Sequence, residues 1–265
     1  MSSTLHVWSA VVEHFQNHLT DLIHSVSNCE LSMYADDRQR YSIGPRIHDV
    51  EKNLNNDGND VSNWYTTNLL QGNFSKYQAI SLGRKSTNTE INVVIMGTEV
   101  TNYPELKLLG VSIESQMNFK GHVSDVCKRA SKQLGVLLRL RNMIPMHAKL
   151  QIYKSAILPL LTYCHVVWHF CCLSDTIKLE RVQEKALRAI YCNRNDTYED
   201  LLKMAKLPTL YNRRLQDIAI LMYKIKHNQC PKYISDLFKR TWCNQSPKKL
   251  RLFHTKSYHC NIWQT

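Results

Sequence analysis

The alternation of apolar and polar positions predicts a β-hairpin near the start of the chain. In residues 29–44, CELSMYADDRQRYSIG, apolar side chains recur at every second position on both sides of a short acidic turn. Such alternation is typical of half-buried strands. The alternating apolar residues are Leu31, Met33, Tyr41 and Ile43. The tip of the hairpin would then carry Asp36 and Asp37.

A helix and further strands are predicted to follow the hairpin. Residues 46–65 place apolar side chains at helical spacing, which predicts an amphipathic helix that Gly58 would weaken. The apolar positions of this helix are Ile47, Val50, Leu54, Val61 and Tyr65. Short runs bounded by Gly, Asn or Thr then predict one strand in each of the ranges 77–82, 91–97 and 106–114.

From residue 122 onward the pattern is helical almost throughout. Residues 122–141 carry an apolar stripe at helical spacing, which predicts a helix with one buried face. The stripe consists of Val123, Val126, Ala130, Leu134 and Leu137. Lys128, Lys132 and Arg139 lie together on the opposite face of the same helix.

A second basic helix is predicted over residues 174–192, with Ser174 or Asp175 as its N-cap. Its buried stripe would consist of Leu179, Val182, Ala186 and Ala189, and beside it runs the row Lys178, Arg181, Lys185 and Arg188. Like charges three and four residues apart repel, so the row favours an anionic ligand lying along the helix. The alternative is a solvated charged face.

Composition excludes several classes of protein. The chain has 265 residues and is 43% hydrophobic, which suffices for a substantial core and argues against disorder. We expect no membrane association, because no apolar run reaches the roughly 20 residues that a membrane span needs. The first residues lack the basic and apolar regions of a secretory signal, so the nine cysteines are expected to be reduced thiols in an intracellular protein.

Charge is distributed unevenly along the chain. Residues 1–119 carry a net charge of −5 and residues 120–265 carry +17, which together give the net charge of +12. A strongly basic half is typical of a protein that faces a polyanion, and nucleic acid is the expected partner.

Two adjacent aspartates at a hairpin tip have two explanations. Aspartate is a common turn residue, but two carboxylates at one turn also offer the hard oxygen ligands that Mg²⁺ requires. Tyr34-Ala35-Asp36-Asp37 resembles the YADD box of reverse transcriptases. Further segments, in the expected order, resemble the downstream half of the polymerase of non-LTR (LINE-type) retrotransposons. They are residues 50–76, 106–123, 129–168 and 179–191, and the resemblance covers roughly residues 20 to 240.

The resemblance implies roles for specific residues. Asp36 would be a direct Mg²⁺ ligand in the palm hairpin and Asp37 would support the same site. Lys76 would act as a general acid for the departing pyrophosphate, or would be an ordinary surface lysine. Leu109 and Gly110 would form the centre of the hairpin that holds the primer terminus. The glycine suggests close approach by another backbone or a ligand.

The same resemblance implies an α+β, mostly helical fold with four regions. Residues 1–26 would be an unrelated or remnant helix, residues 27–119 a partial palm, residues 120–240 a helical thumb and connection, and residues 241–265 a basic tail. The thumb would hold RNA template and DNA primer through phosphates without reading sequence.

The departures from the family pattern predict that this chain is inactive alone. Two-metal nucleotidyl transfer needs a third carboxylate, and only Asp21 precedes the YADD box among aspartates. The fingers and the Pro-Gln-Gly loop that positions dNTP are also expected to be missing. The alternatives are a non-catalytic nucleic-acid-binding remnant and a domesticated protein-interaction module.

Two further expectations concern the partial palm and zinc. A partial palm would leave an uncovered apolar face near Leu31, Met33, Ile80 and Val111. The isolated chain would then aggregate, or an N-terminal helix containing Val11, Val12, Phe15 and Leu19 would cover the face. Zinc is not expected at the C-terminal cysteines and histidines, because their spacing lacks a short CxxC-like pair. These residues are Cys230, Cys243, His254, His259 and Cys260.

Overall fold

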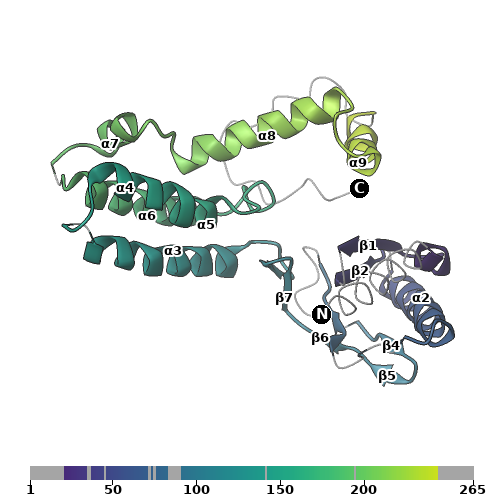
Figure 1. Cartoon of the computed structure of the whole chain (residues 1–265). Coiled ribbons are helices and arrows are strands. Elements are labelled where there is room, and N and C mark those ends of the chain that lie inside the picture. Colours follow the sequence, from purple (N-terminus) through teal and green to yellow (C-terminus); the bar gives the residue numbers. More distant parts are fainter. Residues whose placement is uncertain are drawn as a thin grey trace, which may run out of the picture. The chain divides into compact units, whose positions relative to one another are not determined.

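The computed structural model describes residues 21–34, 37–44, 46–70, 73, 76–82, 91–140, 142–193 and 195–243. The chain divides after Leu106 into two compact units (Figure 1), whereas the sequence placed a boundary after residue 119. The predicted class, mostly helical α+β, is confirmed. None of the helices described is long and apolar enough to cross a membrane.

The first unit contains the predicted hairpin and helix. Strands β1 (Glu30–Tyr34) and β2 (Asp37–Tyr41) pair antiparallel after the short 3₁₀ turn η1 (Ile23–Ser25), and helix α2 (Ile47–Thr67) follows. Leu31 and Met33 pack against the buried cluster of Leu22, Val61 and Tyr65, so the expectation of an uncovered face there is wrong.

The alternation fails on the second strand of the hairpin. Tyr41 and Ile43 are exposed, because the residues that lie opposite Leu31 and Met33 are Arg40 and Arg38. Arg38 donates a hydrogen bond to the hydroxyl of Tyr65. The buried Nη1 of Arg40 finds no acceptor among the described residues. Ile47 at the start of α2 is also exposed, against the prediction.

A second small cluster packs on α2. It contains Ile91, Val93, Ile95 and Val100, together with the short strands around them. β4 (Val94–Ile95) pairs antiparallel with β5 (Thr98–Glu99), and β3 (Gln78–Ala79) pairs parallel with β6 (Thr101–Asn102). The sequence predicted longer strands here, but three backbone N–H groups of residues 91–96 are bonded to helix side chains rather than to another strand.

These side chains form a ladder on α2. Glu51, Asn55 and Asn59 recur every fourth residue and so share one face of the helix. Their side-chain oxygens accept hydrogen bonds from the backbone N–H groups of Asn92, Val94 and Met96, each at 2.8 Å. Alternate N–H groups of one extended segment are therefore satisfied by three successive turns of a helix.

The division between the units falls within the first strand of a hairpin, which the periodicity had predicted as one strand. β7 (Glu105–Leu108) and β8 (Val111–Glu114) are joined by Leu109 and Gly110, whose φ angles are 45° and 84°. Two successive positive φ values turn the chain back on itself. Val111 is buried, so it is not part of an uncovered face.

Helices make up most of the described residues that follow in the second unit (Figure 1). They are α3 (Lys120–Leu140), α4 (Met146–Ile152), the π-helical turn η4 (Tyr153–Ile157), α5 (Leu158–Thr162), α6 (Leu173–Tyr191), α7 (Tyr198–Ala205), α8 (Leu210–Lys226) and α9 (Lys232–Cys243). One core joins α3 to α8, with Tyr153, Leu161 and Trp168 fully buried.

The predicted apolar stripes of α3 and α6 are confirmed, because every position in both stripes is buried. The predicted N-cap of α6 is wrong. The helix begins at Leu173 with Cys172 as its N-cap. Asp175 lies inside the first turn, is 1% exposed and bonds to Lys178 instead.

Candidate nucleic-acid interface

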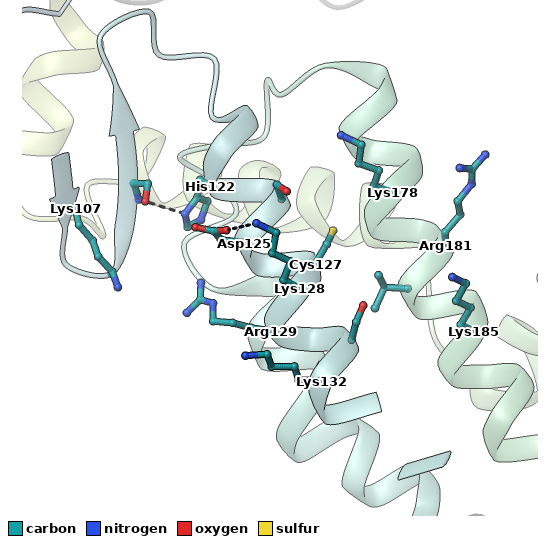
Figure 2. A pocket seen from close by; sticks show the side chains of 15 residues that line it. Lys107, His122, Asp125, Cys127, Lys128, Arg129, Lys132, Lys178, Arg181 and Lys185 are labelled. Atoms are coloured by element: carbon teal, nitrogen blue, oxygen red, sulfur yellow. Dashed lines mark hydrogen bonds and ion pairs between the residues drawn. The ribbon is translucent and has the colours of Figure 1, made fainter. Parts of the chain in front are cut away.

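A groove of about 930 Å³ lies between α3, α6 and the β7–β8 hairpin. In Figure 2 the labelled residue numbers increase in the same direction along both helices, so α3 and α6 run parallel. The cationic residues that line the groove are Lys107, Lys128, Arg129, Lys132, Lys178, Arg181 and Lys185. Asp125 is the one carboxylate among its lining residues.

The packing of the two helices explains how these charges converge. The apolar stripes of α3 and α6 face each other, so the residues that flank each stripe lie at the edges of the same seam. Val182 and the half-buried Cys127 lie at the bottom of the groove, between the two sets of cations. Burial raises the pKa of the Cys127 thiol to about 11, so this side chain is neutral at physiological pH.

Two groove lysines already have carboxylate partners. Lys178 Nζ lies 2.7 Å from Asp175 Oδ1, and this hydrogen bond raises the pKa of Lys178. Lys128 Nζ lies 3.3 Å from Asp125 Oδ1, but both of these side chains are largely exposed. An exposed pair of this kind contributes little, whereas separating a buried carboxylate from its partner is costly.

The structure brings together five of the seven residues predicted to bind nucleic acid. Lys128, Lys132, Lys178, Arg181 and Lys185 all line the groove.

Arg139 and Arg188 do not line the groove. Arg139 lies in the last turn of α3. Arg188 donates to Glu184 Oε1 at 2.7 Å and to the backbone carbonyl of Asp196 at 3.1 Å. The sequence analysis missed Lys107 and Arg129, because one lies on a strand of the hairpin and the other next to the predicted basic face of α3.

The turn of the β7–β8 hairpin is attached to the helical bundle. The hydroxyl of Tyr163 donates to the carbonyl of Leu109 at 2.7 Å, and a Cβ on Gly110 would lie 3.4 Å from the Tyr163 ring. Trp168 Nε1 in turn donates to the Tyr163 carbonyl at 3.0 Å. The close approach expected at Gly110 is therefore made by an aromatic ring of the same unit. No pattern in the sequence pointed to Tyr163.

The predicted catalytic residues lie in the first unit. Asp36 is not among the described residues. Asp37 begins β2, but the structure does not describe its side chain. Lys76 is exposed. The described residues contain no group of three side chains suited to a metal ion. Of the C-terminal cysteines and histidines, Cys230 is described as a free thiol, and the side chains of the others lie outside the described part.

The residues that directly precede the β1–β2 hairpin are bonded to α2 through Asp57. The sequence analysis missed this residue. The fully buried carboxylate of Asp57 accepts from the backbone N–H groups of Asn28 at 2.9 Å and Cys29 at 2.6 Å, and from Asn28 Nδ2 at 2.8 Å. Burial favours the neutral acid, but the hydrogen bonds from Asn28 and Cys29 outweigh it and lower the pKa of Asp57.

Comparison with known proteins gives two curated relatives from Drosophila melanogaster. The RNA-directed DNA polymerase from mobile element jockey is 24% identical over 197 residues, which are 71% of this chain and 21% of that protein. The probable RNA-directed DNA polymerase from transposon X-element is 30% identical over 106 residues, 37% of this chain and 12% of that protein. The chain is related to the reverse transcriptases of non-LTR retrotransposons.

This reverse-transcriptase-related chain spans about a fifth of the length of one relative and about an eighth of the other. No family model matches it, and no solved structure matches it. Reverse transcriptases generally use divalent metal ions and bind nucleic acid.

Proposed function

We propose that the chain is part of an RNA-directed DNA polymerase of a LINE-type element, and that its second unit holds nucleic acid through phosphates. The observation that carries this proposal is the groove, where seven cationic side chains from α3, α6 and β7 surround one ligand-sized space. Phosphate contacts supply affinity without base readout. RNA template and DNA primer are the partners that the relationship favours.

The catalytic part of the proposal depends on the resemblance. Asp36 and Asp37 would bind Mg²⁺, with Lys76 near the departing pyrophosphate. A polypeptide of only these 265 residues supplies no third aspartate that matches the family's catalytic set, so we propose that it binds nucleic acid without polymerising dNTP. The groove does not depend on that chemistry, because its lining residues all lie in the second unit.

The test is the salt dependence of binding to an RNA–DNA heteroduplex. A variant in which the six groove cations Lys107, Lys128, Arg129, Lys132, Arg181 and Lys185 are all changed to Ala should bind more weakly at every sequence. Its plot of log affinity against log salt should flatten by roughly 0.9 for each lost phosphate contact.

A matched control removes the same charge elsewhere in the second unit. It changes six exposed residues that do not line the groove, Lys120, Lys154, Lys203, Lys224, Lys226 and Lys232, to Ala. We expect the control to keep most of the salt slope. Equal slopes for the two variants would refute the groove as the binding site, and salt-independent behaviour of the unmodified chain would favour a protein-interaction module.

A further inference from the structure

The groove cations differ in whether a carboxylate of the protein already binds them. Asp175 is 1% exposed, and its Oδ2 finds no hydrogen-bond donor among the described residues. Lys178 supplies the ion pair to its Oδ1. Moving the ammonium of Lys178 to a bound phosphate would leave a buried carboxylate without a counter-charge, which is strongly unfavourable. Lys178 therefore lines the groove but is retained by Asp175.

Lys107, Arg129 and three further groove cations make no ion pair with a carboxylate of the described residues. Lys132 lies on α3, and Arg181 and Lys185 lie on α6 (Figure 2). The two helices pack directly, with Ala130 and Ala186 completely buried. The free cations thus stand on opposite walls of a seam between two contacting helices.

The width of this seam limits what can enter it. Axes of packed helices are about 8–10 Å apart. The two backbones of duplex DNA are separated by a major groove about 12 Å wide. A single phosphodiester strand that lies along the seam can be reached by cations from both walls, whereas the two backbones on either side of a major groove cannot both lie between these walls. Arg181 and Lys185 are separated by about 6 Å of helical rise, which at 3.4 Å per phosphate corresponds to about two phosphate spacings.

We propose that the groove holds a single phosphodiester strand, gripped across the seam by Lys132 from α3 and by Arg181 and Lys185 from α6, while Lys178 stays with Asp175. This inference rests on the proposed function and specifies the ligand of the same groove. The strand belongs either to a free single strand or to one side of a duplex, and the two share the chemistry that the groove recognises.

Single substitutions that each remove one positive charge test whether these side chains contact the bound strand. Binding of a labelled oligonucleotide is measured by fluorescence anisotropy for Lys132→Gln, Lys185→Gln, their double variant and Lys178→Gln in the full chain. Loss of a charged contact should weaken binding about tenfold for the first two. Lys178→Gln, which removes the same charge from the same groove, should weaken it less than about twofold.

The double variant reports whether both walls hold one ligand. If Lys132 and Lys185 grip the same strand, the loss in the double variant should differ from the product of the single losses, because the second contact depends on the first. If Lys178→Gln is unstable because Asp175 is left unpaired, Lys178→Gln with Asp175→Asn replaces it. Equal losses for Lys178 and Lys185, or strictly multiplicative losses, would overturn the proposal.

Oligonucleotides of different length, in single-stranded and duplex form, test whether the groove holds a single strand. Affinity for single-stranded RNA or DNA should stop rising after about four to six nucleotides, and a duplex should show a salt slope no steeper than about 3. A slope that doubles for duplex would refute the single-strand grip while leaving the proposed function intact. An affinity that requires duplex would show that the strand belongs to one side of a duplex. Failure of every nucleic acid to bind would refute the proposed function as well.

Discussion

At the scale of single residues, Asp57 on α2 accepts the hydrogen bonds that join this helix to the start of the YADD hairpin. The resemblance drew attention to the tip of this hairpin, but the base is where a buried carboxylate accepts several N–H groups at once. Periodicity could not reveal this role, because Asp57 lies in the polar run NNDGND and periodicity locates only apolar faces. Its importance comes from residues about thirty positions earlier in the chain.

Asp57→Asn should destabilise the first unit by about 1–3 kcal/mol, because one carboxylate oxygen is replaced by an amide donor that faces N–H groups. The pKa of Asp57 is lowered in the folded protein, so its contribution is fully present above the ordinary value of about 3.9 and is lost as pH falls through the lowered pKa. The difference in unfolding free energy between the two proteins should therefore shrink below about pH 4. Asp60→Asn, an exposed change on the same helix, is the control for thermal unfolding from pH 3 to 7.

Tyr163→Phe should loosen the β7–β8 turn while leaving the bundle folded. The ring can still lie against Gly110, but the Leu109 carbonyl loses its hydrogen bond, a change of about 0.5–1.5 kcal/mol. Hydrogen exchange should therefore accelerate in residues 105–114 and not in α3. Tyr233→Phe, at a more exposed tyrosine, should change neither rate. Unchanged exchange at the turn in Tyr163→Phe would show that the hydroxyl does not hold it.

At the scale of elements, the sequence predicted which face of a helix is buried better than it predicted which elements pack against each other. The buried stripes of α3 and α6 were identified residue by residue, because a helix repeats its exposure every few residues. That the two stripes meet, and so bring two basic rows into one groove, is a property of tertiary packing that neither segment encodes locally. The strands failed for a related reason, since residues 91–96 bond to a helix and residues 106–114 fold into a hairpin.

Gly58 illustrates the same limit in α2. The sequence predicted a weakened helix, yet α2 runs through Gly58, where a Cβ would lie 2.8 Å from Ile95 Cγ1 and 3.1 Å from Arg40 Nη1. Gly58→Ala should therefore destabilise the protein by about 1–3 kcal/mol, despite the better helix propensity of alanine. Gly135→Ala in α3, where a Cβ would meet nothing within 4 Å, should stabilise it by up to about 1 kcal/mol. Thermal unfolding of both variants checks the opposite signs, and a shared sign would contradict the packing argument.

At the scale of the whole molecule, binding and catalysis are expected to separate. A polypeptide of only these 265 residues should bind heteroduplex but show no primer extension with Mg²⁺ or Mn²⁺. Two carboxylates on one turn do not fix two ions about 3.5 to 4 Å apart. Asp36→Ala should accordingly change no measurable rate. Template-dependent dNTP incorporation that is abolished by Asp36→Ala would contradict this expectation.

The side-chain ladder on α2 also bears on aggregation. The segment INVVIM, residues 91–96, is uncharged and apolar except for Asn92, which is a composition typical of sequences that stack into cross-β fibrils. One edge of this segment pairs with β5, and the alternate N–H groups of the other edge are already bonded to Glu51, Asn55 and Asn59. A strand from a second molecule would have to displace all three side chains before it could add to that edge. The side chains of α2 thus block the free edge to which a strand of this composition from another molecule would otherwise add.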